Sequence, residues 1–391
     1  MSLSLFAVCA PGLERVLTQE LSTLGLAPPQ RHRTTSKDAP EGGVEFRGNL
    51  HTLYRANLHL RTASRILVRL GAFHATAFAE LRQKASQLEW EKFTAPGQPI
   101  ALRVTCHKSR LYHSDAVAER VAGAMEDRLG YPVPHIKSHD DSDEASDSQL
   151  IVVRLAQDQC AISVDSSGGL LHRRGYRLAT GKAPLRETLA AGLLIASGWD
   201  RQAQSPLLDP FCGAGTIAIE AALLARNRAP GEARHFAFMN WPGYSAPTWK
   251  ALLAEAKAQQ RESCPPIFAS DRDAGAIETA RANTERADVA ANIEFTRRAV
   301  SDIEPPAGLG WMITNPPYGV RVQAKNDLRN LYARFGQVLR AKCPGWQVGI
   351  LIADAPLQAS LNLPFDEGRS VWLMNGGLRV KLARARVPLS K

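Results

Sequence analysis

A glycine-rich turn between an apolar strand and a helix constrains the fold of this chain more than any other feature. Leu207-Leu-Asp-Pro-Phe is typical of a short buried strand, Thr216–Ala225 has helical spacing, and Gly213 and Gly215 stand between them. Glycines at such a turn supply backbone freedom and remove side chains where a ligand must come close to the backbone. We therefore predict a strand–turn–helix unit whose turn holds a nucleotide-like ligand.

Strands and helices alternate after this turn. Further strands are predicted at 267–270, 293–295, 311–314 and 347–352, and helices at 274–286 and 328–339. Such alternation predicts an α/β fold, a mostly parallel sheet with helices on both faces. Ligands of these sheets bind beyond the carboxyl ends of the strands, which is where the turn falls. Residues 226–264 interrupt the pattern and are expected to form a partly helical insertion.

The amino-terminal half has a different, α+β pattern. Helices are predicted at 13–24, 50–60, 77–88 and 114–129, and strands at 44–47, 66–73, 100–105, 150–155 and 159–164. Residues 138–148 are acidic and rich in turn formers, which is typical of a solvated loop.

Composition limits the functional class. The net charge of +10 and the pI of about 9.5 attract a polyanion without specifying it. Six cysteines lie far apart, without a CxxC pair or a His/Cys cluster, so we expect no zinc site, no disulfide framework and a cytoplasmic location. No apolar run approaches the roughly 18 residues of a membrane helix, and we expect neither a signal peptide nor a membrane partner.

Carboxylates around the glycine turn favour S-adenosylmethionine (SAM) as its ligand. Gly-x-Gly-x-x-Ala also fits a dinucleotide, but Asp209 would repel a pyrophosphate and can accept a hydrogen bond from an ammonium group. Asp271 ends the next strand, where it can bind both ribose hydroxyls, and Asp302 follows the third, near the adenine amino group. The alternative is helix capping by Asp209 and Asp273 and surface charge at Asp302. The remaining expected cofactor contacts are Phe211, Thr216 and, through its backbone only, Cys212.

The segment Asn315-Pro-Pro-Tyr318 has the parts of a base clamp. The side-chain carbonyl of Asn315 and the backbone carbonyl of Pro316 can accept both protons of a base amino group and aim its lone pair at a methyl carbon. Pro316 and Pro317 fix the backbone, and Tyr318 can stack on the base. Adenine, guanine and cytosine all present such an amine. The alternative is a proline-stiffened turn with a core tyrosine.

Five segments together resemble one family. They are Leu171-His-Arg-Arg-Gly-Tyr-Arg177, Ala183-Pro-Leu-Arg-Glu-Thr-Leu189, Asp209–Thr216, Phe238-Met-Asn-Trp-Pro242 and Thr314-Asn-Pro-Pro-Tyr-Gly319. Over nearly its whole length the chain resembles the THUMP-domain RNA guanine methyltransferases, which include the amino-terminal module of the bifunctional 23S rRNA enzyme and related tRNA enzymes. The first two segments are the most specific, because general amino-methylases lack them.

The resemblance implies a ferredoxin-like part at 1–65, an RNA-docking THUMP domain at 66–166 and a Rossmann-like methyltransferase domain at 167–391. It implies 2-methylguanosine as the product, in 23S rRNA first and in tRNA as the alternative. Glu187 would close the cofactor pocket, unless it only caps a helix. Two departures stand out: the second methyltransferase of the bifunctional enzyme has no counterpart in this sequence, and the acidic loop lies in the half expected to bind RNA.

For RNA contact we favour the basic cluster His172, Arg173, Arg174 and Arg177, because arginine forks suit phosphate. These arginines could equally brace the domain junction against acidic neighbours, and Lys108-Ser-Arg110 is a weaker second set. The rival functions are a DNA adenine 6-amino methyltransferase, a non-catalytic RNA-binding assembly factor and a nicotinamide enzyme. We expect a monomer.

Overall fold

The computed structural model describes residues 2–26, 42–137, 148–177, 185–199, 205–318 and 325–389. The predicted acidic loop, apart from Ser148, lies outside the described residues, as do Ala183, Pro184 and Gly319 of the family-like segments. Among the described residues, no helix is both long and apolar enough to cross a membrane. The chain divides into two compact units. The first unit comprises Met1–Cys9, Thr18–Leu171 and Arg234–Ala254, and the second comprises Ala10–Leu17, His172–Ala233 and Glu255–Lys391.

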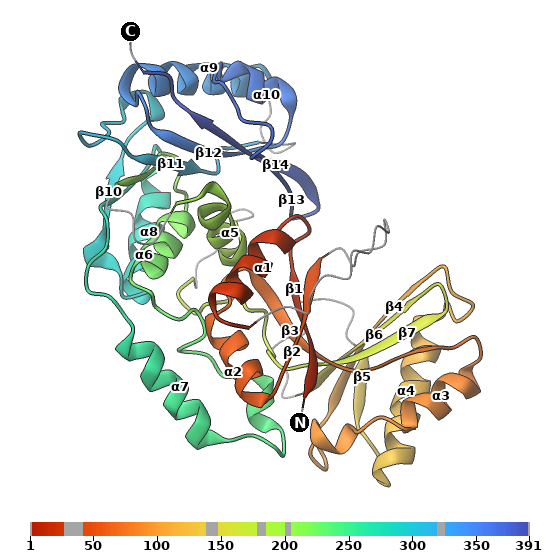
Figure 1. The fold of residues 1–391 in the computed structure, drawn as a ribbon. Coiled ribbons are helices and arrows are strands. Elements are labelled where there is room, and N and C mark those ends of the chain that lie inside the picture. Colours follow the sequence, from red (N-terminus) through yellow and green to blue (C-terminus); the bar gives the residue numbers. More distant parts are fainter. Residues whose placement is uncertain are drawn as a thin grey trace. The chain divides into compact units, whose positions relative to one another are not determined.

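The first unit is built on a mixed sheet. Its elements are β1 (Leu3–Cys9), β2 (Gly43–Gly48), α2 (Leu50–His59), β3 (Ala63–His74), α3 (Phe78–Ser86), η1 (Trp90–Lys92), β4 (Ile100–His107), α4 (Ser114–Leu129), β5 (His135–Lys137), β6 (Gln149–Ala156), β7 (Gln159–Asp165) and η3 (Ala237–Asn240). The described strands form one seven-stranded sheet in the order β2-β1-β3-β7-β6-β4-β5 (Figure 1). Only β4 pairs in parallel, with β5 and β6. Helices α1 (Glu14–Thr23) and α7 (Ala246–Ala258) are divided between the two units.

Part of the predicted insertion belongs to the core of the first unit. The ring of Phe238 stacks on Tyr54, with centroids 4.5 Å apart. The indole Nε1 of Trp241 donates a hydrogen bond of 2.7 Å to the side-chain oxygen of Gln149. The segment is partly helical, as predicted, but its buried aromatic side chains pack with residues that precede it in the chain by about a hundred positions or more.

The second unit is the predicted α/β structure. Its elements are α5 (Glu187–Ser197), β8 (Leu207–Asp209), α6 (Thr216–Ala225), β9 (Ile267–Asp271), α8 (Ala274–Arg286), η4 (Ala290–Asn292), β10 (Ile293–Arg297), η5 (Val300–Asp302), β11 (Trp311–Thr314), α9 (Lys325–Lys342), β12 (Gln347–Ile352), α10 (Ala355–Ser360), β13 (Val371–Asn375) and β14 (Leu378–Arg386). The described strands form a second seven-stranded sheet, in the order β10-β9-β8-β11-β12-β14-β13. The five strands β10, β9, β8, β11 and β12 run parallel to one another. β14 pairs antiparallel with β12, and β13 pairs antiparallel with β14, so these two strands form a hairpin at the edge of the sheet.

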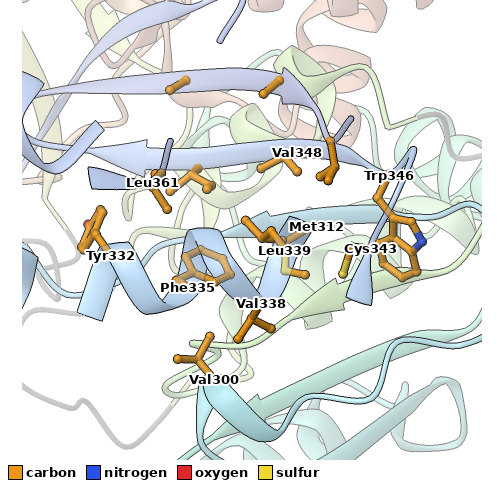
Figure 2. Close-up of a cluster of buried hydrophobic side chains, with 14 of the residues drawn as sticks. Val300, Met312, Tyr332, Phe335, Val338, Leu339, Cys343, Trp346, Val348 and Leu361 are labelled. Atoms are coloured by element: carbon orange, nitrogen blue, oxygen red, sulfur yellow. The ribbon is translucent and has the colours of Figure 1, made fainter. Parts of the chain in front are cut away.

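A buried cluster fixes helix α9 on one face of this sheet. Tyr332, Phe335 and Leu339 are three and four residues apart, so they form one stripe of the helix, and each is fully buried. They pack with Met312 of β11 and Val348 of β12, as Figure 2 shows. Helix α5 contacts β11, β12 and β14. This packing holds β11 and its following loop in place.

Candidate active site

Two motifs distant in the sequence meet at the carboxyl edge of the second sheet. β8 and β11 are neighbouring parallel strands, with Leu208 opposite Met312. Asp209, the last residue of β8, therefore lies beside Thr314, the last residue of β11. The Thr314 hydroxyl donates a hydrogen bond of 2.6 Å to Asp209 Oδ1, although the two residues are 105 positions apart in the sequence. Asn315 follows directly, so the glycine turn and the proline loop begin at the same edge.

Asp209 is a buried carboxylate with an unused acceptor. Its side chain is 1% exposed, and its Oδ1 also accepts from the backbone N–H of Phe211 at 3.3 Å. Its Oδ2 is buried and has no hydrogen-bond partner in the described part of the chain. Burial raises the pKa of Asp209 to about 7, against the lowering effect of the Thr314 hydrogen bond. A buried carboxylate is stabilised by a cation, and the ammonium group of SAM is such a partner.

The two glycines of the turn have different roles. Gly213 has φ +50 and an added Cβ would meet nothing within 4 Å, so its backbone is open toward a ligand. Gly215 has φ +81, and an added Cβ would lie 3.0 Å from Ala280 Cβ, so it allows α6 to pack on α8. The backbone N–H of Gly213 donates a hydrogen bond of 3.1 Å to Asp271 Oδ2. The left-handed backbone at both positions is what only glycine adopts without strain.

A cavity of ≈ 420 Å³ lies beside this turn. Of the expected site residues, it is lined by Asp209, Phe211, Cys212, Gly213, Thr216 and Asn315. Its other lining residues were not predicted as site residues; they are Leu185, Ala214, Ile217, Asp273, Gly275, Ala276 and Thr279. For those from Asp273 to Thr279 the sequence held a signal, the start of α8, because a helix that starts at the carboxyl edge presents its first residues to the same ligand. Gly215, Asp271, Asp302 and Glu187 are not among the lining residues.

The carboxylates after β9 and β10 are placed as follows. Asp271 accepts from the Gly213 N–H with one oxygen and from the Asp273 N–H, at 3.0 Å, with the other. Asp273 caps α8 by accepting a hydrogen bond of 2.9 Å from the Gly275 N–H, which is the role that the helix-capping alternative predicted for it. It also lines the cavity. Asp302 is exposed in η5. Asp271 therefore shapes the glycine turn in this structure.

The proline loop presents an unused acceptor as well. Asn315 Oδ1 is buried and has no hydrogen-bond partner within the described ranges. Pro316 is buried and Pro317 is exposed, and the Tyr332 hydroxyl donates to the Pro317 carbonyl at 3.3 Å. The Tyr318 hydroxyl accepts a hydrogen bond of 2.7 Å from Asn375 Nδ2. The loop is thus fixed at several points, whereas the amide oxygen that lines the cavity is left for a ligand.

The segment before the methyltransferase pattern is largely engaged in ion pairs. Arg174 and Glu220 are 3.7 Å apart with side chains 3% and 0% exposed, and Arg177 and Glu187 are 2.9 Å apart. The Tyr176 hydroxyl donates to Glu220 at 3.0 Å. Burial raises the pKa of Glu187 to about 7, although Arg177 opposes this. Arg174 and Arg177 thus pair with acidic side chains inside the second unit, whereas the bracing alternative placed such pairs at the domain junction.

Of the other basic residues considered for RNA contact, Arg173, Lys108 and Arg110 are exposed and His172 is buried. Arg173 lies on the surface, whereas His172 is buried, and burial together with the neighbouring arginines lowers the pKa of His172 to about 3. His172 is therefore neutral at physiological pH and offers no charge to a phosphate. In the first unit, Lys108 and Arg110 are exposed next to Tyr112, whose side chain is 68% exposed.

Metal and thiol chemistry have no evident site in the described residues. Within those ranges, no group of three or more His, Cys, Asp or Glu side chains that could hold a metal ion occurs. Cys212 is buried at the glycine turn, and burial raises the pKa of its thiol well above the ordinary value. It is a neutral thiol at the cavity wall.

Comparison with known proteins agrees with this architecture. Family models match the RlmL ferredoxin-like domain at residues 4–67, the THUMP domain at 75–165 and the RMKL-like methyltransferase domain at 174–384. The chain is 34% identical to "Putative RNA methyltransferase slr0064" of Synechocystis sp., over 97% of this chain and 95% of that protein. It is 35% identical to the ribosomal RNA large subunit methyltransferase K/L of Methylococcus capsulatus, over 98% of this chain but only 51% of that relative, so it spans about half of the relative's length.

A solved structure adds the cofactor. SMU.472 complexed with SAH is 28% identical to this chain, with a TM-score of 0.86 over 100% of this chain and 99% of the other. The fold and the site thus define a class I, Rossmann-like methyltransferase. The chain belongs to the THUMP-domain family of SAM-dependent RNA methyltransferases, as its motifs predicted. Its cofactor is SAM, which supplies an activated methyl group when bound, and the unpaired Asp209 oxygen and the open backbone at Gly213 fit it.

Proposed function

We propose that this enzyme methylates the exocyclic 2-amino group of a guanosine in RNA, with 23S rRNA as the first substrate and tRNA as the alternative. The observation that carries the proposal is the unpartnered, buried Asn315 Oδ1, which lines the same cavity as Asp209. A base amino group bound to this oxygen lies next to the cofactor pocket. The Methylococcus relative, a ribosomal RNA methyltransferase by name, supports the substrate class.

In this proposal the chain acts by positioning and by hydrogen bonding. Asn315 Oδ1 and the Pro316 carbonyl accept the two amino protons, which localises the nitrogen lone pair and directs it at the methyl carbon. Pro317 holds the backbone, and the ring of Tyr318, anchored by Asn375, stacks on the base. With SAM bound, the methyl carbon–sulfur bond would break as the amino nitrogen takes the methyl group, SAH would leave, and the proton lost from the amino group would pass to solvent.

The cofactor contacts are assigned from the cavity outward. Asp209 accepts from the ammonium group, and Phe211, Cys212, Gly213 and Thr216 form the wall of the pocket. We keep Asp271 as the ribose ligand, for which it must exchange one of its backbone hydrogen bonds. Asp302 remains proposed for the adenine amino group. Glu187 is proposed to act indirectly. It holds Arg177, which donates a hydrogen bond to the carbonyl of Leu185, and Leu185 lines the pocket.

RNA docking is proposed for residues 66–166, between a ferredoxin-like part at 1–65 and the methyltransferase domain at 167–391. The exposed Lys108, Arg110 and Tyr112 combine charge with a stacking surface there. Arg173 is the member of the predicted arginine cluster that lies on the surface. Arg174 and Arg177 are proposed to act indirectly, by bracing the second unit through their ion pairs with Glu220 and Glu187.

The test uses purified protein, labelled SAM, and separate rRNA and tRNA pools that lack the modification, followed by nucleoside mass spectrometry. Label in 2-methylguanosine supports the proposal, and the labelled pool names the substrate class. Label in 6-methyladenosine overturns the guanine assignment. The clamp alone does not select guanine, because adenine and cytosine present a similar amino group. Binding of SAM without any label, with both pools, favours either an assembly intermediate as the substrate or the non-catalytic assembly factor.

A further inference from the structure

The hairpin of β13 and β14 has an outward face that the proposed reaction does not use. Trp372 pairs with Lys381, and Met374 pairs with Arg379, so these four side chains share one face; we call it the hairpin face. Its exposed members are Trp372 and Arg379, whereas Lys381 is buried. The intervening Leu373 is 1% exposed and points into the core. Trp372, in contrast, is 48% exposed, which is unusual for the largest apolar side chain.

The charges of the hairpin face are positive and one of them is uncompensated. The guanidinium carbon of Arg379 lies 4.5 Å from the centroid of the Trp372 ring, in cation–π contact. Lys381 Nζ lies 5.8 Å from the same centroid but is paired with Glu367. In the described part of the chain, no carboxylate lies within ion-pair distance of the exposed Arg379. The face therefore offers a stacking surface and a free cation, which together suit a nucleic acid better than a neutral protein surface.

The hairpin is directly connected to the proposed base clamp. Asn375, the last residue of β13, donates its side-chain hydrogen bond to the Tyr318 hydroxyl at 2.7 Å. It lies three residues from Trp372, a distance of about 10 Å along a strand. Gly376 and Gly377 form the two-residue turn with φ +55 and +83, which fixes the register of the hairpin. Because Asn375 lies an odd number of residues from Trp372, the two side chains leave the strand on opposite faces, so an RNA strand whose target base lies on Tyr318 would reach Trp372 around the glycine turn of the hairpin.

We propose that the hairpin face binds the RNA strand next to the target nucleotide. An unpaired base stacks on the Trp372–Arg379 pair, and the N–H edge of the guanidinium donates to a phosphate of the same strand. Sequence-specific RNA recognition uses single-stranded bases in this way, stacked on aromatic rings and on guanidinium planes. The inference rests on the proposed function in one respect, namely that RNA is the substrate.

The experiment compares Trp372→Ala, Trp372→Phe and Arg379→Ala with two controls that remove similar exposed groups elsewhere in the second unit. The controls are Leu309→Ala, at a side chain 57% exposed, and Arg334→Ala, on the exposed side of α9. Binding to unmodified rRNA and tRNA is measured by fluorescence anisotropy at several salt concentrations. SAH affinity, melting temperature and the KM for RNA are measured on the same preparations.

We expect Trp372→Ala to weaken RNA binding by about fivefold or more, since loss of one base–aromatic stack has at least this effect, and Trp372→Phe to restore most of it. Arg379→Ala should lower the slope of log K against log salt by about one phosphate contact. SAH affinity and melting temperature should stay unchanged, and both controls should behave as the wild type.

Unchanged RNA affinity in both Trp372→Ala and Arg379→Ala would overturn the inference while leaving the proposed reaction intact. A change in oligomeric state with unchanged RNA affinity would overturn it in favour of a protein interface. Conversely, the wild type could methylate adenosine while its RNA binding is still weakened by Trp372→Ala. This result would refute the guanine assignment and support RNA binding by the hairpin face. A wild type that binds neither RNA pool refutes both.

Discussion

Replacing Asp209 by Asn should separate the stability of the second unit from its ability to bind the cofactor. Asn keeps an oxygen to accept from Thr314 but removes the ionisable group. Burial raises the pKa of Asp209 to about 7 from 3.8, so the fold favours the neutral acid. Its stabilising contribution is fully present below about pH 4 and is lost as the pH rises to about 7, for a total of about 4 kcal/mol at 1.36 kcal/mol per pKa unit.

About 3 kcal/mol of this loss falls between about pH 5 and about pH 8.5. Urea unfolding of the apo-protein at these two values should therefore show a decline in the wild type that Asp209→Asn lacks. The double difference cancels other buried acids such as Glu187. The relevant transition is the one that SAH shifts, because a ligand stabilises the unit that binds it.

SAH binding should respond in the opposite direction. The ammonium group needs the ionised carboxylate, so wild-type affinity should fall by about tenfold per pH unit below about pH 7, and Asp209→Asn should bind weakly at every pH. Isothermal titration calorimetry measures both. A double difference in unfolding free energy below about 1 kcal/mol, or wild-type affinity independent of pH, would refute the assignment of Asp209 as a buried, cation-seeking carboxylate.

The remaining predictions concern the clamp, the arginine segment and the core. Asn315→Ala should abolish methyl transfer and leave SAH affinity within about a few-fold, as measured by single-turnover assay and calorimetry; a parallel loss of SAH affinity would contradict the clamp. Arg173→Ala should lower the salt slope of RNA binding by about one. Arg174→Ala should destabilise the unit by about 3–5 kcal/mol, because it leaves the buried carboxylate of Glu220 without this ion pair; a wild-type stability of Arg174→Ala would argue against the bracing role. Gly336→Ala should cost about 1–3 kcal/mol in urea unfolding, because its Cβ would lie 2.0 Å from the backbone oxygen of Leu361. A wild-type midpoint would show that α9 and α10 can separate without cost.

Local patterns predicted most of the second unit. The predicted helix 274–286 and strands 311–314 and 347–352 coincide with α8, β11 and β12. Each depends on information within its own segment: apolar spacing, a capping residue, or a continuous apolar run typical of a buried parallel strand. The carboxyl-edge location of both motifs followed from the same alternation.

Elements with weaker local signals were missed. No strand was predicted for β1, for β13 or for β14, and no helix for α5. Leu378–Leu382 alternates apolar and polar residues after Gly376-Gly377, a hairpin signal that the sequence contains. Helix α5 is apolar on nearly all sides because it is buried throughout, so it lacks the one-sided stripe that marks a surface helix.

The sequence by itself determined the α/β class, the motifs and the identity of the cofactor, because these depend on backbone preferences and residue chemistry within short segments. Only the tertiary structure decided which charged side chains are buried and which are exposed. Arg174 is buried against Glu220, 46 positions further along the chain, whereas its neighbour Arg173 is exposed, and no local pattern distinguishes the two. Likewise, only folding buried Asp209, raised its pKa and left one of its oxygens without a partner in the described part of the chain. Burial and long-range pairing are properties of the folded chain, and they set the electrostatics on which the function depends.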